Sequence, residues 1–433
     1  MGCWLDSTNR KESVNLHTRL LGLLAFLLVA VSVLPAIAQQ SGPSPSDQGG
    51  GPSAQGGQAP AAAPAQQPPP STPPTWSAGP IDFSGAVDGY YSYNFQHPAD
   101  RTNRLYNFNI PAQQFGLDLV EFGIAHSPDP IGGEIDLGFG QAFKTVGATD
   151  LGDNGFNQYV RQAFVSIKPA KAKGFELDFG KFVTSAGAEV IESYTNWNYS
   201  HSLLFAWAIP YFHFGVRTSW PMGKHLTGGF QLVNGWNNLV DNNSGKTIGP
   251  NVTITYSKWT WVIDYYGGPE NPDTNKGWRS LFDTTLTLTP SSKASVYLNY
   301  DYGQNRNVNG AGTATTNSAT WKGFAGALRV QAAPKVAFVG RGEWFNDTDG
   351  FNTGVAQQVK EVTFTGEYKI IEGLLWRGEY RHDWSDQPFF LDHTPPVCIG
   401  ALTTCVVTPF GVGNSKHQNT LTFAVIAFFG PKR

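Results

Sequence analysis

Between residues 80 and 433, long and short connections alternate strictly between segments that have the period of a β-strand. In each segment, apolar and polar side chains alternate, as they do on a strand with one apolar and one polar face. Short connections such as 127–130 and 221–224 alternate with long ones such as 96–113 and 184–209. Transmembrane β-barrels have this asymmetry, with tight periplasmic turns, long external loops and an even number of strands. A β-propeller or a secreted sandwich would not require it.

We therefore predict an all-β fold, a transmembrane antiparallel β-barrel of about sixteen strands with short periplasmic turns and long extracellular loops. Each segment is close to the ~9–11 residues that a tilted strand needs to cross a bilayer. The predicted strands are 81–95, 114–125, 131–142, 159–168, 174–183, 210–220, 225–235, 248–257, 259–267, 279–289, 293–302, 321–332, 335–345, 358–369, 373–383 and 418–429. The predicted long loops include 143–158, 236–247, 268–278, 303–320, 346–357 and 384–417.

The two faces of the predicted strands differ in a way that fits a membrane barrel. One strand places Phe175, Leu177 and Phe179 on one face, and Glu176 and Asp178 on the other. A ring of about sixteen strands is wide enough to hold water, so we expect the polar face to line the lumen and the apolar face to contact lipid. Trp and Tyr residues also gather near strand ends, where amphipathic rings meet lipid headgroups.

The composition argues against some other classes of protein. Charged residues make up 15% of the chain, against roughly 25% in ordinary soluble domains. The formal net charge is -3 and no long basic run is present, so we do not expect the chain to bind nucleic acid. After residue 38, no stretch of roughly eighteen apolar residues could form a transmembrane helix.

The part of the chain before the predicted barrel falls into two segments. Residues 1–38 have the pattern of a secretory signal peptide, in which basic residues precede the apolar run 20–34 and cleavage is expected after Ala38. An N-terminal membrane anchor is the alternative, but the run is shorter than the ~20 residues of a spanning helix. Residues 39–79 are rich in Pro, Gln, Gly and Ala and are expected to be disordered, which leaves 80–433 as the outer-membrane β-barrel.

Two cysteines remain once the signal peptide is removed. Cys398 and Cys405 lie close together in the predicted loop 384–417. In a chain exported to an oxidising compartment, we expect them to form a disulfide rather than to remain as two free thiols. The histidines show no ligand spacing on a strand face, so we expect no metal site, and we expect no cofactor.

Several runs of residues resemble the OmpL-like β-barrel porin family. The runs that carry this resemblance are Val87–Phe95, Gly180–Thr184, Ala188–Glu192, Asn196–Ser200, Val233–Asn238, Tyr265–Glu270 and Arg377–Asp383. The similarity covers essentially all of 80–433, and it implies a bacterial outer-membrane barrel that acts as a porin. One feature departs from the pattern, because many such barrels end on an aromatic residue, whereas here Phe428 and Phe429 are followed by four further residues.

Charged residues on the predicted inner face are the candidates for pore function. They could set up a transverse field that orients solutes and sets ion preference. They could equally pair across strands and hold the wall rigid, and both interpretations stay open. Because carboxylates outnumber arginines, we expect a mild preference for cations. The predicted pore-lining residues are Asp82, Asp88, Glu134, Asp136, Glu176, Asp178, Arg217, Arg329, Arg341, Glu343, Glu367, Arg377, Glu379 and Arg381.

The long connection 184–209 is the best candidate for a loop that folds inward and constricts the lumen. It carries Glu189, Glu192, Trp197 and Tyr199, a set of charges and rings that is unusual in a loop that only faces solvent. The carboxylates would supply negative charge, and the rings could narrow the bore or contact a solute. The alternative is a surface loop that packs against its neighbours, or a contact between subunits.

These observations favour an outer-membrane porin that gives passive diffusion of small hydrophilic solutes and ions through a water-filled lumen. Its expected partners are outer-membrane lipid, such solutes, and further copies of itself in a homotrimer. The competing interpretation is a surface-exposed binding or adhesion barrel with a closed lumen. An enzyme is not expected, because His213 and His382 have no obvious nucleophile partner.

Overall fold

The computed structural model describes residues 76–150, 155–308, 314–393, 406–408 and 411–430. The predicted signal peptide 1–38, its cleavage after Ala38, and most of the predicted disordered segment 39–79 lie outside these residues. Cys398 and Cys405 also lie outside them, so their disulfide stays a prediction.

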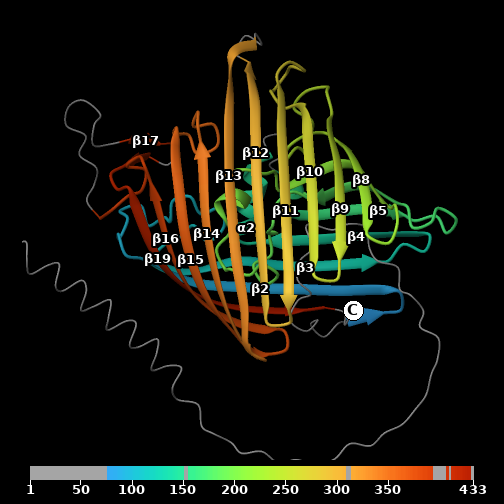
Figure 1. Cartoon of the computed structure of the whole chain (residues 1–433), viewed down its shortest axis with the longest axis horizontal. Coiled ribbons are helices and arrows are strands. Elements are labelled where there is room, and N and C mark those ends of the chain that lie inside the picture. The colour runs from blue at the N-terminus through green and yellow to red at the C-terminus, as the bar shows by residue number, and fades with distance from the viewer. Residues whose placement is uncertain (1–75, 151–154, 309–313, 394–405, 409–410, 431–433) are drawn as a thin grey trace, which may run out of the picture. The chain divides into compact units, whose positions relative to one another are not determined.

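The described chain forms a closed antiparallel β-barrel of sixteen strands, the number that the sequence predicts (Figure 1). Neighbouring strands in the sequence pair with each other, and the pairing of β19 with β2 closes the ring. The barrel strands are β2 (Ile81–Asn94), β3 (Gln114–His126), β4 (Ile131–Phe139), β5 (Val160–Ile167), β6 (Glu176–Val183), β7 (Phe212–Pro221), β8 (Leu226–Val233), β9 (Thr247–Tyr256), β10 (Trp259–Pro269), β11 (Trp278–Ser291), β12 (Ala294–Val308), β13 (Ala314–Ala333), β14 (Val336–Asp347), β15 (Gln357–Ile371), β16 (Leu374–Ser385) and β19 (His417–Phe429).

Two of the predicted long loops contain more strand than expected. Most of the predicted loop 303–320 is a continuation of β12 and β13, which stay paired as far out as Val308 and Ala314. A two-stranded ladder satisfies the backbone hydrogen-bonding groups of this stretch. The predicted loop 384–417 contains a short hairpin of β17 (Val406–Thr408) and β18 (Gly411–Gly413).

The prediction that 39–79 is disordered is wrong at the C-terminal end of this segment, because Trp76–Ala78 form a short strand, β1. This strand pairs with the first three residues of β2. β19 pairs with β2 only from Gly85 onward, so the start of β2 has an edge that β19 does not cover. A turn at Gly79, whose φ is +63°, brings β1 onto this edge, where its backbone groups find partners.

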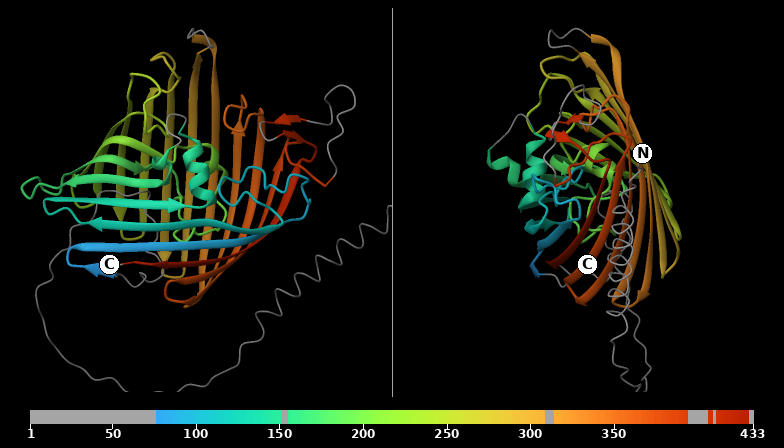
Figure 2. Two further views of the ribbon diagram at one scale, coloured as in Figure 1. Left: turned by 180° about the vertical axis from the view of Figure 1, so that it is seen from behind. Right: turned by 90° about the vertical axis from the view of Figure 1, so that its left-hand side faces the viewer.

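The barrel has a low wall and a tall wall. Strands β5, β6 and β8 have 8 residues each, whereas β12 has 15 and β13 has 20. In Figure 1, β10–β13 stand upright, while β2–β4 run across behind them. Figure 2 shows the shorter strands in front when the molecule is seen from behind. We call β4–β8 the low wall and β10–β16 the tall wall.

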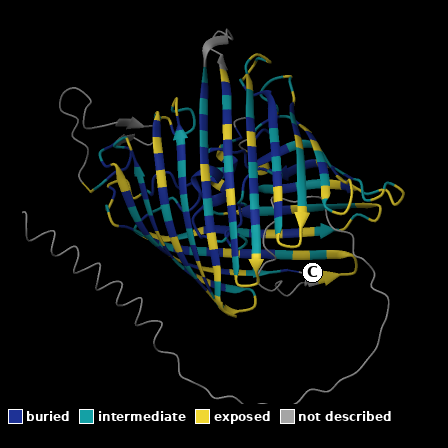
Figure 3. Cartoon of the chain, viewed as in Figure 1, coloured by how far each residue is buried: buried dark blue, intermediate teal, exposed yellow. Residues whose placement is uncertain are grey.

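On the strands, most polar side chains point inward and most apolar side chains point outward. On β16, Arg377 and Arg381 are each 1% exposed, whereas Trp376 is 38% and Tyr380 is 39% exposed. Figure 3 shows this alternation of buried and exposed residues on the upright strands. Soluble proteins place their apolar face inside, so the reverse arrangement suits a barrel whose outer surface meets hydrocarbon.

Part of the space inside the barrel is filled by connections between strands. Phe108, Phe143 and Phe205 come from three different connections and belong to one buried apolar cluster. The cluster also includes Leu119 of β3 and Trp321 of β13, so it extends from one side of the barrel to the other. These connections contain α2 (Gln141–Ala148), the 3-10 helix η1 (Phe156–Tyr159) and α3 (Leu203–Trp207). In the described part of the chain, no helix is both long and apolar enough to cross a bilayer.

Candidate functional site: the inner loop and the cavities beside it

Residues 184–209, which connect β6 to β7, form a segment that we call the inner loop. Its side chains Glu189, Glu192 and Tyr199 are 4%, 5% and 2% exposed. Trp197 is half-buried, with its ring 5.0 Å from that of Tyr297 on β12. These side chains are therefore packed against other parts of the barrel and are not exposed to solvent.

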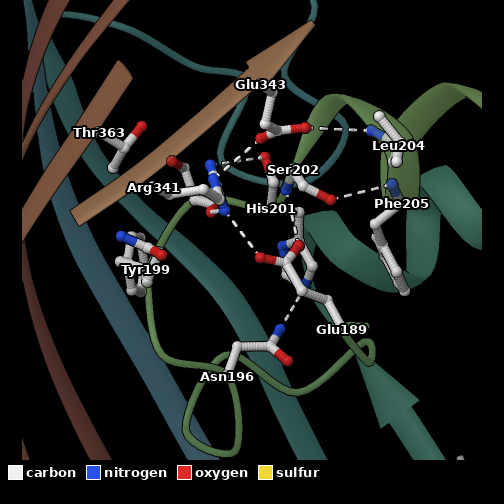
Figure 4. Close-up of polar contacts among 12 residues, drawn as sticks. Glu189, Asn196, Tyr199, His201, Ser202, Leu204, Phe205, Arg341, Glu343 and Thr363 are labelled. Carbon is white, nitrogen blue, oxygen red and sulfur yellow. Dashed lines mark hydrogen bonds and ion pairs between the residues drawn. The ribbon is translucent and has the colours of Figure 1, made fainter. Parts of the chain in front are cut away.

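Arg341 of β14 holds the middle of the inner loop, as Figure 4 shows. Its guanidinium lies 2.7 Å from a carboxylate oxygen of Glu189 and 2.8 Å from the carbonyl oxygen of Ser200. It also lies 2.9 Å from both Glu343 and Glu361. The side chain of Arg341 is fully buried. Because a buried charge is costly unless it is paired and hydrogen-bonded, Arg341 and the docked loop stabilise each other.

Two glutamates of the tall wall accept hydrogen bonds from the backbone of the inner loop. Glu379 accepts from the N–H of Tyr199 at 2.6 Å and from that of Ser200 at 2.9 Å. Glu343 accepts from the N–H of Leu203, the first residue of α3, at 2.8 Å. Carboxyl oxygens are strong acceptors, and these hydrogen bonds satisfy backbone donors that are buried away from water.

Two arginines of β16 donate to carbonyl oxygens of the same loop. Arg377 donates to the carbonyl of Asn196 at 2.7 Å and forms an ion pair with Glu367 at 2.6 Å. Arg381 donates to the carbonyl of His201 at 2.7 Å. The tall wall therefore binds both the donors and the acceptors of the loop backbone, which fixes its path.

The opposite side of the inner loop is held by β2 and by the low wall. Arg161 of β5 lies 2.7 Å from Glu192 of the loop and 2.8 Å from Asp136 of β4. The hydroxyl of Tyr199 donates to Asp88 of β2 at 3.0 Å. Since both sides of the barrel hold the loop, it lies across the lumen.

Most of the remaining predicted pore-lining residues have partners on the wall itself. Cross-strand pairing is therefore present at these positions, whereas an electric field across the pore stays a prediction. The pairs are Asp178–Arg217 at 2.7 Å, Glu367–Arg329 at 2.8 Å, Glu176–Lys168 at 3.2 Å, Glu134–Gln162 at 2.9 Å and Asp82–Ser77 at 2.6 Å.

Arg161 and a row of three aspartates also line the inner face, although they are not among the predicted pore-lining residues. Asp264, Asp283 and Asp301 lie opposite one another on β10, β11 and β12, and each is at most 1% exposed. We call them the aspartate row. Ser185 of the inner loop donates to Asp264 at 2.5 Å, and no basic side chain of the described residues forms an ion pair with the row. Strand alternation places each aspartate on the inner face, but only the register of the strands aligns the three.

His201 lies at the centre of the inner loop, between two aromatic rings. Its ring centre is 4.7 Å from that of Phe108 and 4.7 Å from that of Phe205. Burial lowers the pKa of His201 to about 4, although Glu189 acts in the opposite direction. The imidazole is therefore neutral at neutral pH. In the described part of the chain, no group of three or more His, Cys, Asp or Glu side chains is arranged to hold a metal ion.

Two cavities of similar size adjoin different parts of the inner loop. The first, which we call the outer cavity, measures about 380 Å³ and is lined by long connections and the end of α3. The second, which we call the turn-side cavity, measures about 360 Å³ and is lined by the first half of the inner loop and by the short turn at Ser127. Arg161, Arg217, Glu134 and Glu192 line the turn-side cavity, whereas aromatic rings dominate the outer cavity.

The fold is similar to those of solved outer-membrane proteins. The outer membrane channel DcaP of Acinetobacter baumannii aligns with a TM-score of 0.52 at 10% identity, over 81% of this chain and 97% of that one. OmpT of Vibrio cholerae aligns with a TM-score of 0.51 at 11% identity, over 82% and 100%. OmpF of Salmonella typhi aligns with a TM-score of 0.51 at 13% identity, over 81% and 97%. At such identities the similarity concerns the fold alone. No curated protein matches the chain in sequence.

The family comparison covers nearly the whole barrel. The family described as "Putative beta-barrel porin-2, OmpL-like" matches residues 80–429. This range agrees with the extent of the resemblance that the sequence motifs indicate, so that prediction is confirmed. Family and fold together indicate an outer-membrane barrel of the porin type. The chain belongs to the OmpL-like beta-barrel porin-2 family.

Proposed function

We propose that this protein is an outer-membrane channel through which small hydrophilic solutes and ions diffuse passively, and that the inner loop sets the width of its lumen. The observation that carries the proposal is the clamp between Arg341 and the inner loop, which holds a loop across a barrel with a polar inner face. A loop that is held in one position narrows the lumen by a constant amount. Conduction would then depend on the space that remains beside the loop.

Single-channel conductance of the reconstituted protein tests this proposal. Deleting residues 189–199 removes Glu189 and much of the inner loop that crosses the lumen, and it is expected to raise the conductance of each channel. A matched control deletes residues 272–275, an exposed connection between β10 and β11, and should leave the conductance unchanged. Equal conductance of the wild type and the 189–199 deletion would contradict the role of the loop.

The charges of the inner face support a mild preference for cations as part of the same proposal. The aspartate row adds three buried carboxylates that form no ion pair with a described basic side chain. Negative charge at a narrow passage favours cations electrostatically. Reversal potentials in a salt gradient measure this preference, and a clear preference for anions would contradict it.

We also propose that the barrel assembles as a homotrimer, with the low wall covered by a neighbouring copy. The 8 residues of β5, β6 and β8 are fewer than the ~9–11 that a tilted strand needs to cross the hydrocarbon. Phe179 on β6 is nevertheless 56% exposed in the single chain. Light scattering of the detergent-solubilised protein gives the number of copies, and a monomer would overturn this part of the proposal.

A binding barrel with a closed lumen is the second candidate, and one observation favours it. The apolar cluster around Phe108, Phe205 and Trp321 fills part of the space inside the barrel with side chains from loops and walls. A correctly folded wild-type protein that carries no current in a planar bilayer would support this second candidate over a channel.

A further inference from the structure

The outer cavity combines aromatic rings with donors that have no acceptor. It measures about 380 Å³, within the range of roughly 300–1,000 Å³ that is usual for small-molecule sites. Its walls include Trp207 at the end of α3, Trp236 after β8, Trp321 of β13 and Phe351 after β14. No aspartate or glutamate lines it, in contrast to the turn-side cavity.

Arg279, near the start of β11, is the charged group of this cavity. Its guanidinium carbon lies 5.1 Å from the ring centres of both Trp236 and Phe351, so two rings hold the side chain in place. Its Nε donates to the side-chain oxygen of Asn305 at 3.0 Å. No carboxylate of the described residues forms an ion pair with Arg279. The terminal guanidinium nitrogens are therefore available to an acceptor that enters the cavity.

Glu270 is the acid whose charge acts on Arg279, but it is engaged elsewhere. Its oxygens accept hydrogen bonds from the backbone N–H of Trp236 and from the hydroxyl of Thr247. It does not line the cavity. Among the residues that line the cavity, no carboxylate therefore competes with a ligand for Arg279.

A second donor in the same wall has no partner. The side-chain nitrogen of Asn352 is buried and donates to no acceptor in the described part of the chain. A buried donor without an acceptor costs about 1–3 kcal/mol, which a bound ligand with suitable oxygens would recover. Arg279 and Asn352 can therefore both donate hydrogen bonds to a ligand oxygen, and the charge of Arg279 favours an oxygen that is negatively charged.

The aromatic residues of the cavity offer their faces rather than their polar atoms. The indole N–H of Trp207 donates to the carbonyl of Leu105 at 2.9 Å, and that of Trp321 donates to the carbonyl of Ala208 at 3.0 Å. Trp207 and Trp236 are half-buried, so part of each ring can be reached. Such surfaces favour a flat apolar group, which stacks against them.

We propose that the outer cavity binds a small aromatic carboxylate, with the carboxylate held by Arg279 and the side-chain amide of Asn352, and the ring of the ligand held against Trp207 and Trp236. A neutral sugar fits less well, because its hydroxyl groups need acceptors as well as donors and the cavity wall contains no carboxylate. This inference rests on the proposed channel function in one respect: it makes the outer cavity the place where a solute is selected before it passes the inner loop.

Isothermal titration of the purified full chain in detergent tests the proposal with sodium benzoate as the probe. Benzamide has the same shape without the charge, and acetate has the charge without the ring, so both should bind at least about tenfold more weakly than benzoate. Equal binding of benzoate and benzamide would overturn the role of the charge, and equal binding of benzoate and acetate would overturn the role of the rings.

Substitutions in the wall of the outer cavity test whether benzoate binds there. Arg279→Gln should weaken benzoate binding by about tenfold to a hundredfold and leave benzamide binding unchanged, which also shows that the cavity is still folded. Asn352→Ala should have a smaller effect in the same direction. Arg306→Gln is the matched control, because Arg306 is an exposed arginine on the neighbouring strand β12 and does not line the cavity. Full benzoate affinity in Arg279→Gln would overturn the proposal.

The binding assay and the conductance assay fail independently. If benzoate binds as expected but no current flows, the proposed binding site is supported and the channel proposal is contradicted. If current flows but benzoate does not bind, the channel stands and this inference is overturned.

Discussion

Two rows of carboxylates cross the inner face of the tall wall, and only one of them has basic partners. On β14–β16, Glu343, Glu361 and Asp383 lie opposite one another. On β10–β12, the aspartate row has the same arrangement, with three acids aligned on three neighbouring strands. Both rows are buried in the described structure, so the backbone geometry alone does not distinguish them.

The two rows differ in the side chains that lie two residues away from each acid on the same strand. Next to the first row lie Arg341, Thr363 and Arg381, which are also in register. Arg341 lies 2.9 Å from Glu361, and Arg381 lies 2.7 Å from Asp383. The positions next to the aspartate row carry neutral residues instead, namely Val262, Thr285 and Asn299.

The two rows therefore have different roles although their geometry is alike. The arginines turn the first row into a clamp, because each of them also binds carbonyl oxygens of the inner loop. The aspartate row contacts the loop through the hydroxyl of Ser185 and forms no ion pair with a basic side chain of the described residues. A basic neighbour two residues along the strand thus distinguishes the row that holds the inner loop from the row that does not.

The largest effect is expected from breaking the clamp. Arg341→Met keeps the length of the side chain but leaves Glu189, Glu343 and Glu361 without their shared cation. Removing one partner of a buried ion pair costs about 3–5 kcal/mol, so the free energy of unfolding should fall by that amount and the conductance should rise. Urea-induced unfolding in detergent and planar-bilayer recording measure the two effects.

Arg306→Met is the control for this prediction, since Arg306 is exposed and forms no part of the clamp. It should change the free energy of unfolding by no more than about 0.5 kcal/mol. A loss below 1 kcal/mol in Arg341→Met would show that the clamp is not needed to hold the loop.

Acidification should weaken the same clamp through His201. Burial lowers its pKa from 6.5 to about 4, so an undocked loop takes up a proton below pH 6.5 that the docked loop does not accept. The stability of the docked state is therefore complete above pH 6.5 and falls as the pH drops toward 4, by at most about 3 kcal/mol.

Thermal unfolding of the wild type at pH 7 and pH 5 measures this loss. His201→Gln cannot take up the proton and should show a smaller difference in melting temperature between the two pH values. An identical pH dependence in both proteins would mean that His201 is not the group that senses acid.

The smallest effect on stability is expected in the aspartate row. Asp283→Asn replaces the middle one of three aligned carboxyl groups with an amide of the same shape, so the free energy of unfolding should stay the same or rise by up to about 1 kcal/mol. The reversal potential should nevertheless shift toward a weaker preference for cations. A marked loss of stability would show that this row is a structural element like the clamp.

Much of the barrel could be predicted from the sequence because the period of two is a local property. The segment predicted at 373–383 is β16 (Leu374–Ser385), and its alternation placed Arg377 and Arg381 on the inner face. The inner loop was also recognised, because Glu189, Trp197 and Tyr199 are unusual in a loop that faces only solvent. Arg161 and the aspartate row were missed, since nothing near them in the sequence marks their neighbours.

The order of apolar and polar residues along this chain was enough to predict the number of strands and the face that most of their side chains take, and specific sequence motifs indicated the family. The tertiary structure alone decided which acids meet an arginine, that the inner loop lies across the lumen, and that Arg279 faces a cavity of aromatic rings. The physical reason is that the face of a strand depends on neighbouring residues, whereas register and loop docking depend on contacts between residues far apart in the chain.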